Sequence, residues 1–156
     1  MISWTPVTVP TYQHFEDLPV WQESARLYNL VCDLLETSGT GATFGFRNQL
    51  DRAALSVSNN IAEGFERATT NELLAFLAIA RGSAGEVRSM ITVVRDRPRL
   101  SVFVAQLDRI RGAAASCARQ ITAWISSIER APVQGKRHLT PSARTARQAR
   151  TVAVSP

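Results

Sequence analysis

Apolar residues recur at helical spacing along four long segments of this chain, and this pattern constrains the fold more than any other feature. The segments span about residues 17–37, 44–67, 69–97 and 100–130. Within each segment, apolar side chains return every three or four residues, which places them on one face of an α-helix. No segment alternates apolar and polar residues with a period of two, as a half-buried strand does. The sequence therefore predicts an all-α fold.

Local signals indicate where the helices begin and how they connect. Asp17 is the expected N-cap of the first helix, and Thr69 with Glu72 forms a capping-box pattern at the start of the third. The Gly-rich stretch 39–45 is interpreted as an interhelical turn, because it lacks the Gly-Lys-Ser/Thr ending of a P-loop. Four helices with short connections predict an antiparallel up-down-up-down four-helix bundle over residues 17–131.

The positive charge of the chain is concentrated at its C-terminal end. Residues 1–130 carry thirteen arginines and thirteen acidic residues, so their charges cancel. The net charge of +5 comes from residues 132–156, where one lysine and four arginines stand among small and polar residues. This composition predicts a basic, disordered tail of the kind that commonly binds nucleic-acid phosphates. Residues 1–16 are expected to form a short lead before the bundle.

Several classes of protein do not fit the sequence. A chain of 156 residues has the length of one domain, which argues against a multi-domain enzyme. No uncharged stretch has the ~20 apolar residues that span a bilayer, and the first residues lack the pattern of a secretory signal. The two histidines, His14 and His138, lie outside the helical segments, so no His–carboxylate or Cys–His pair is expected on the helices. We therefore expect a cytoplasmic protein with no enzymatic activity, no metal, no cofactor and no membrane partner.

Apolar residues extend beyond a single face on the first three helical segments. Large apolar patches on soluble proteins usually mark interfaces, so these residues predict a homo-oligomer. The alternative is that the four-helix core absorbs them, with the first fifteen residues packed over them. The predicted interface residues are Val20, Leu27, Leu34, Leu55, Leu74 and Ile79.

Three stretches of the chain carry motifs of a known family. Residues 15–21 read FEDLPVW, residues 49–64 read QLDRAALSVSNNIAEG, and residues 72–86 read ELLAFLAIARGSAGE. In this order they resemble the opening F-x-D-L-x-V-W, the signature Q-x-R-R-A-A-x-S-I-x-x-N-I-A-E-G and the third helix of the 23S rRNA intervening-sequence proteins, a four-helix bundle family. The resemblance covers about residues 14–97, and Asp51 departs from the basic residue usual at its position.

The resemblance implies a left-handed up-down bundle that assembles as a homopentamer and binds nucleic acid. Some members are encoded within insertions in large-subunit ribosomal RNA genes. A related bundle is the accessory protein of diversity-generating retroelements, which engages a reverse transcriptase and RNA. We therefore expect a non-enzymatic, homo-oligomeric bundle that binds structured RNA or DNA through phosphates with little sequence selectivity. The alternative is a protein–protein adaptor or assembly module, such as a reverse transcriptase accessory subunit.

The candidate site residues form two sets. The polar positions that match the family signature are interpreted as structural: Gln49, Ser56, Asn60, Glu63, Gly64, Ser83 and Glu86. The predicted nucleic-acid contacts are basic residues on the helix surfaces and in the tail: Arg47, Arg52, Arg67, Arg81, Arg88, Lys136, Arg137, Arg144, Arg147 and Arg150. For the helix arginines, the alternative is a solvated surface with ion pairs to nearby acids.

Overall fold

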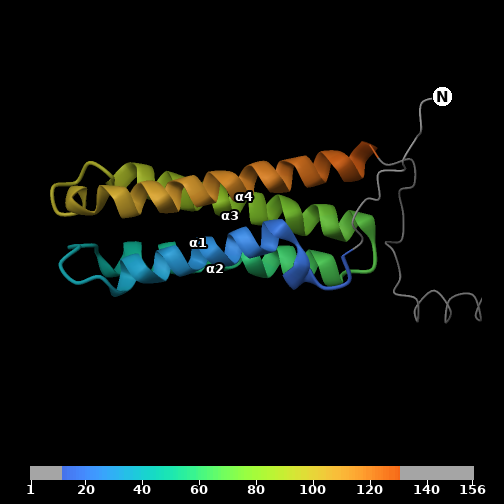
Figure 1. The fold of residues 1–156 in the computed structure, drawn as a ribbon, viewed down its shortest axis with the longest axis horizontal. Coiled ribbons are helices and arrows are strands. Elements are labelled where there is room, and N and C mark those ends of the chain that lie inside the picture. The colour runs from blue at the N-terminus through green and yellow to red at the C-terminus, as the bar shows by residue number, and fades with distance from the viewer. Residues whose placement is uncertain (1–11, 131–156) are drawn as a thin grey trace, which may run out of the picture.

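The computed structural model of the protein describes residues 12–130, which form an antiparallel bundle of four helices (Figure 1). The helices are α1 (Pro19–Glu36), α2 (Phe44–Glu66), α3 (Thr70–Val94) and α4 (Val104–Arg130). Short 3-10 turns, η1 (Phe15–Asp17) and η2 (Ser101–Phe103), precede α1 and α4. No strand occurs among these residues, so the predicted all-α class and four-helix bundle are confirmed. The predicted tail, 132–156, and residues 1–11 of the predicted lead lie outside the described residues.

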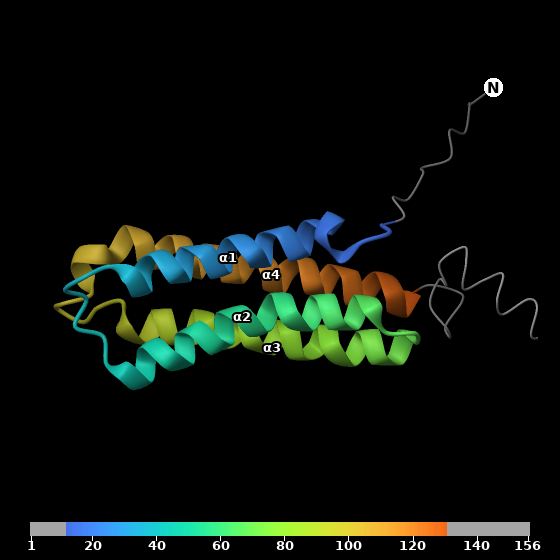
Figure 2. The same ribbon diagram turned by 90° about the horizontal axis from the view of Figure 1, so that it is seen from below.

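The helices follow one another around the bundle. α1 packs against α2 and α4, and α3 packs against the same two helices. In Figure 2, α1 lies beside α4 and α2 lies beside α3. The connections 37–43 and 95–103 lie together at one end of the bundle, and the short α2–α3 turn lies at the other (Figures 1 and 2). None of the helices within residues 12–130 is long and apolar enough to span a membrane.

The helix starts follow local chemistry, with one departure from the prediction. The Thr69 hydroxyl accepts a hydrogen bond from the backbone N–H of Glu72 (3.3 Å) and donates one to its carboxylate (2.7 Å), as a cap should. Asp17 was the expected cap of α1, and this prediction is wrong. The chain makes the turn η1 through Asp17, so Leu18 takes the N-cap position without a side-chain bond. Pro19 begins the helix, where its missing N–H is not needed.

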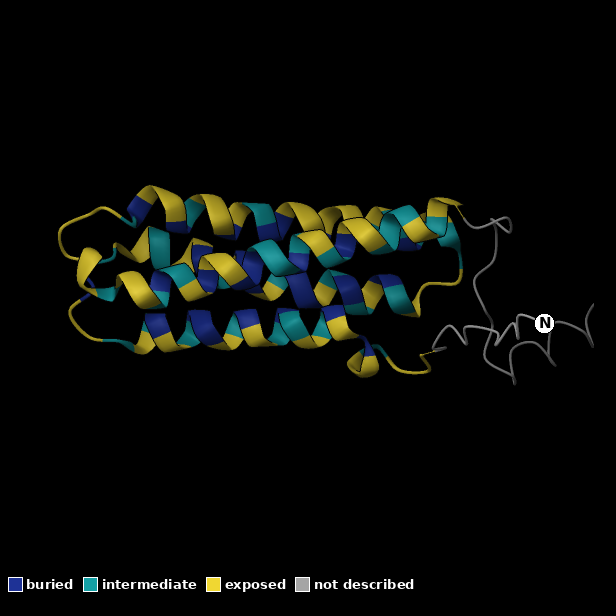
Figure 3. Ribbon diagram, turned by 45° about the horizontal axis from the view of Figure 1, so that its top comes forward, coloured by how far each residue is buried: buried dark blue, intermediate teal, exposed yellow. Residues whose placement is uncertain are grey.

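One apolar core runs through the bundle, and it corrects part of the predicted interface. Figure 3 shows buried residues on the helix sides that face other helices. Val20, Leu27 and Leu34 are buried in this core and do not offer surface to a second copy, so their assignment to an interface was wrong. The wide apolar arc of α1 serves two neighbours, α2 and α4, which explains why one core absorbs it. Leu74 is half-buried, whereas Leu55 and Ile79 stay exposed, with 37% and 52% of their surface open.

The connection between α1 and α2 is an interhelical turn, as the glycines predicted. Gly39 and Gly41 have φ of 81° and 61°, in the left-handed region that favours glycine. Gly41 also lies against Arg99 of the neighbouring connection: a Cβ atom there would be 2.5 Å from the Arg99 Cδ atom. The two connections at this end of the bundle therefore pack on each other through a position that only glycine fills without strain.

We expect the substitution Gly41→Ala to lower the free energy of unfolding by about 1–2 kcal/mol, because an L-residue in the left-handed region costs that much. Urea unfolding followed by circular dichroism measures the change. Gly45→Ala is the matched control, since a Cβ at Gly45 meets nothing and its φ is not positive. An equal loss in both variants would contradict the role of Gly41.

Candidate nucleic-acid interface

A row of polar side chains fills the contact between α2 and α3. The hydroxyls of Ser56 and Ser83 share a hydrogen bond of 2.9 Å across the two helices. The Asn60 amide donates to the Ser56 carbonyl oxygen (2.7 Å) and to its hydroxyl (3.0 Å). One helical turn or more away, the Gln49 amide donates to the Glu86 carboxylate. Every buried side-chain nitrogen and oxygen of the described residues has a partner, so this row is satisfied within the bundle.

The same contact continues towards the α2–α3 turn. Arg67 pairs with Glu63 on its own helix, and its guanidinium lies 5.0 Å from the ring centroid of Phe76 on α3. A Cβ atom on Gly64 would lie 2.9 Å from the Phe76 Cβ and 3.2 Å from Leu73, so only glycine allows the helices to approach this closely. The predicted family polar positions thus meet in or beside one contact, where their bonds support the structural interpretation.

Asp51, the position that departs from the family signature, faces α1 instead of α3. The Tyr28 hydroxyl of α1 donates a 3.0 Å hydrogen bond to its carboxylate. That bond, together with burial, raises the pKa of Tyr28 to about 12. The bond contributes stability that is present below the ordinary tyrosine pKa of about 10 and is lost as pH rises through the raised value. Asp51 therefore joins α1 to α2 through this bond.

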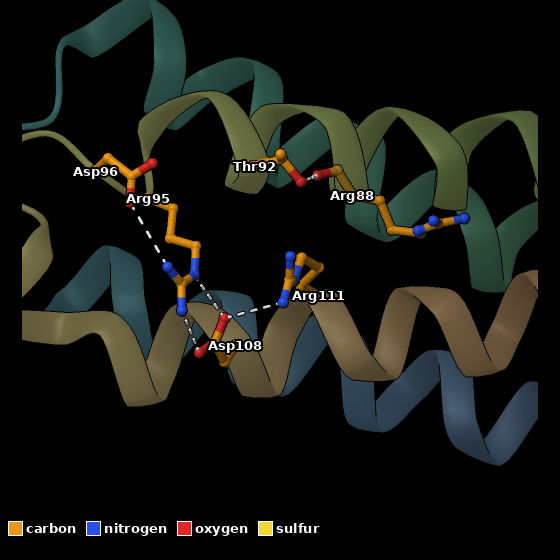
Figure 4. Close-up of polar contacts among 6 residues, drawn as sticks. All are labelled: Arg88, Thr92, Arg95, Asp96, Asp108 and Arg111. Carbon is orange, nitrogen blue, oxygen red and sulfur yellow. Dashed lines mark hydrogen bonds and ion pairs between the residues drawn. The ribbon is translucent and has the colours of Figure 1, made fainter.

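A groove of about 670 Å³ separates the outer edges of α3 and α4 (Figure 4). Residues from both helices line it, among them Gly85, Arg88 and Thr92 of α3 and Asp108, Arg111 and Gly112 of α4. This groove is open to solvent and carries charged side chains. Arginines of two different helices therefore line a common cavity here.

Asp108 organises the charges at one end of the groove. Two nitrogens of Arg95, Nε and Nη2, donate to its carboxylate at 2.9 and 3.0 Å. The Arg111 guanidinium lies 3.4 Å from the same carboxylate, and Arg95 also lies 3.5 Å from Asp96. The hydrogen bonds from Arg95 lower the pKa of Asp108, which keeps its carboxylate ionised. Figure 4 shows both arginines reaching this one acid.

Arg88 lies further along the groove and has no acid beside it. Its backbone carbonyl accepts a 2.7 Å bond from the Thr92 hydroxyl, but its guanidinium has no ion-pair partner within residues 12–130. The same holds for Arg52 and Arg81, which are also exposed. Three of the predicted phosphate contacts on the helices are therefore free to bind an external anion.

The other helix arginines of the prediction have internal partners. Arg47 donates to the backbone carbonyl of Leu35 near the end of α1, and Arg67 is held by Glu63 and Phe76 as described. The contact of Arg67 with Glu63 is an ion pair of the kind that the alternative interpretation describes, whereas Arg47 bonds to a backbone carbonyl and to no acid within residues 12–130. The remaining predicted contacts lie outside the described residues: Lys136, Arg137, Arg144, Arg147 and Arg150.

The sequence interpretation missed Arg95, Arg111 and Asp108. One signal could have found Arg95, because it follows Arg81 and Arg88 at intervals of seven residues and so lies on the same side of α3. No comparable signal exists for Arg111 and Asp108, since their place in the groove depends on how α4 packs beside α3.

Two glycines line the groove without a packing reason. A Cβ atom at Gly85 or Gly112 would meet nothing within 4 Å, although both residues lie in the interior of a helix. Glycine there is less favourable than alanine by about 0.5–1 kcal/mol. Because neither residue has a side chain, no side-chain atoms enter the groove at these two positions.

Comparison with known proteins gives matches to both the sequence and the fold. A sequence model of the 23S rRNA-intervening sequence protein family matches residues 16–123. The chain is also similar to the crystal structure of a protein of unknown function from the S23 ribosomal protein family of Bacteroides thetaiotaomicron, with a TM-score of 0.62 and 17% sequence identity. That alignment covers 68% of this chain and 97% of the other, and at this identity it supports the fold alone. No curated protein sequence matches the chain.

The different surroundings of the helix glycines predict opposite effects of one added methyl group. Gly112→Ala should raise the free energy of unfolding by about 0.5–1 kcal/mol through helix propensity. Gly64→Ala should lower it by about 1–3 kcal/mol, because the new Cβ would collide with Phe76. Urea unfolding of the two variants tests this pair, and a loss of stability in Gly112→Ala would show that the groove is tighter than the structure indicates.

Proposed function

The chain belongs to the 23S rRNA-intervening sequence protein family, and on that premise we propose that it is a non-enzymatic bundle that binds structured RNA or DNA through phosphate contacts. The bundle acts in the cytoplasm as a homo-oligomer, a pentamer. Its selectivity for sequence is low, because arginines that contact phosphates do not read the bases.

The observation that carries this proposal is the exposed arginine pair on α3. Arg81 and Arg88 have no acidic partner within residues 12–130, although the positive and negative charges of residues 1–130 balance. Neighbouring acids such as Asp96 and Asp108 are paired with other arginines, so positive charge is left along this side of α3. An unpaired guanidinium forms strong bidentate contacts with phosphate.

The C-terminal residues add to this charge. Residues 132–156 hold five basic residues and no acid. In an oligomer, each subunit would contribute its own α3 arginines and its own basic segment to the same polyanion. Weak contacts that are linked in this way bind more tightly together than any one does alone, because the second contact forms at a high effective concentration.

The exposed apolar residues support assembly of several copies. Leu55 of α2 and Ile79 of α3 remain on the surface after the core has formed. These residues also favour the second candidate function, a protein–protein adaptor such as a reverse transcriptase accessory subunit, in which a different protein covers them.

Salt dependence tests the nucleic-acid proposal. A labelled, structured RNA is titrated with the full-length protein while its fluorescence anisotropy is followed between about 50 and 200 mM salt. We expect affinity to fall steeply as salt rises, with a log–log slope of about −0.7 to −0.9 for each phosphate bound. A full-length variant with every basic residue of 132–156 changed to Gln should bind with a shallower slope, by about one unit for each phosphate that it no longer binds.

A control variant distinguishes the effect of the basic residues in 132–156 from the effect of removing a positive charge elsewhere. Arg109→Gln removes one exposed charge from α4 without touching the groove or the tail, and it should leave the slope nearly unchanged. Absence of binding at the lowest salt concentration would overturn the nucleic-acid function and favour the adaptor.

Sedimentation equilibrium tests the assembly. We expect the full-length protein to have the mass of about five chains of 17.1 kDa. The double variant Leu55→Glu, Ile79→Glu should shift the mass towards the monomer, because it places a charge where apolar side chains meet a neighbour. Val102→Glu is the control: Val102 is also exposed, but it lies in η2 at the end of the bundle. A monomeric wild-type protein would contradict the oligomer.

A further inference from the structure

We propose that the groove between α3 and α4 binds one phosphate of a phosphodiester backbone between the guanidiniums of Arg88 and Arg111. This inference rests on the proposed function and deepens it, because it assigns the contact to one groove and one ligand group. Both side chains line the groove, and they come from different helices. In Figure 4 the Arg88 side chain extends along α3, and a turn towards Arg111 would let the two guanidiniums hold one phosphate from two sides.

The charges in the groove fit one phosphodiester. Two arginines, Arg88 and Arg111, and one carboxylate, Asp108, line the groove, and beside it Arg95 pairs with Asp108 and with Asp96. One positive charge is left over, and it matches the single negative charge of a diester phosphate. Arg95 is occupied by both carboxylates, so the surplus charge belongs to Arg88 and Arg111.

Arg111 is positioned by Asp108 and yet available. Its single contact with the carboxylate, at 3.4 Å, is longer than the two bonds that Arg95 makes with the same group, at 2.9 and 3.0 Å. Asp108 would therefore keep a full pair of hydrogen bonds if Arg111 turned to a phosphate oxygen. The guanidinium has five N–H donors, so it can also contact the phosphate while it stays near Asp108.

The size of the groove favours a backbone phosphate over free phosphate. Its volume of about 670 Å³ exceeds what a single phosphate ion fills and leaves room for the sugars on either side. Gly85 and Gly112 keep that room open, since neither has a side chain in the groove and neither is needed for packing. Arg81 lies seven residues before Arg88, about 10 Å along α3, where a strand that continues along the groove would pass it.

The first test follows the arginine side chains directly. The Nε–Hε signals of the full-length protein are recorded by NMR during titration with inorganic phosphate, with a short single-stranded RNA and with a polyglutamate peptide. We expect the RNA to shift the signals of Arg88 and Arg111 at lower concentration per phosphate than inorganic phosphate does, while Arg109 shifts little. Tighter binding of inorganic phosphate would assign the groove to a free anion and overturn the proposal. An equal response to polyglutamate would overturn it in favour of an acidic protein partner.

The second test fills the groove without changing its charge. Gly112→Gln places a long neutral side chain in the groove, and Gly82→Gln is the matched control, because Gly82 is also helical and open but does not line the groove. We expect RNA affinity to fall roughly tenfold in Gly112→Gln and in the double variant Arg88→Gln, Arg111→Gln. The control variants Gly82→Gln and Arg109→Gln should bind as the wild type does, and all four should keep the thermal midpoint of the wild type or exceed it.

The outcomes separate this inference from the proposed function. If the wild type binds RNA with a steep salt dependence and the groove variants bind as tightly as their controls, the groove assignment fails and the nucleic-acid function stands. If the wild type does not bind RNA at any salt concentration, the proposed function itself fails. The assignment is supported only by weaker binding in both groove variants with no change in their controls.

Discussion

The packing of α3 between α2 and α4 is the constraint on which the rest of the structure depends. α3 buries an apolar stripe from Leu73 to Val94 in the core, which leaves a polar flank on each side. One flank carries Ser83 and meets α2, and the other carries Arg88 and borders α4. Because side chains leave a helix at fixed angles, the place of the apolar stripe decides which polar residues face each neighbour.

The two flanks of α3 differ in what a ligand would have to displace. On the α2 side, Ser56, Asn60 and Ser83 bond to one another, and a buried polar group that loses its partner costs about 1–3 kcal/mol. On the α4 side, Arg88 has no ion pair within residues 12–130 that a ligand would have to break. The contact of Arg111 with Asp108 is long and open to solvent. Exposed ion pairs of this kind contribute little to stability. The polar residues that match the family signature thus lie in or beside the closed flank.

Apolar patterning predicts which residues are buried, but it does not say whether the same chain or another molecule buries them. α1 carries a wide apolar arc, and the arc is buried within one chain because α1 has two neighbours in the bundle. In the sequence, Leu55 and Ile79 resemble the apolar residues of the α1 arc, because they too extend the apolar surface beyond a single face of their helices. They nevertheless remain exposed, since they lie on the outer side of α2 and α3. The difference arises from the order of the helices around the bundle, which periodicity along one helix does not contain.

The sequence by itself determined the local structure. Helical periodicity set the number and type of the elements, the Thr69 cap set the start of α3, and the glycines marked the turn between α1 and α2, since each of these depends on residues close in the chain. Asp17 failed as a cap because a 3-10 turn intervenes, and that turn packs on α2 as well as α1. Only the tertiary structure decided which arginines are free. The partners of Arg47 and Arg95 lie twelve and thirteen residues away, beyond the three or four residues over which side chains meet on one helix. For these two arginines, the partner is therefore settled only when two helices pack, and so is the availability of the guanidinium to a ligand.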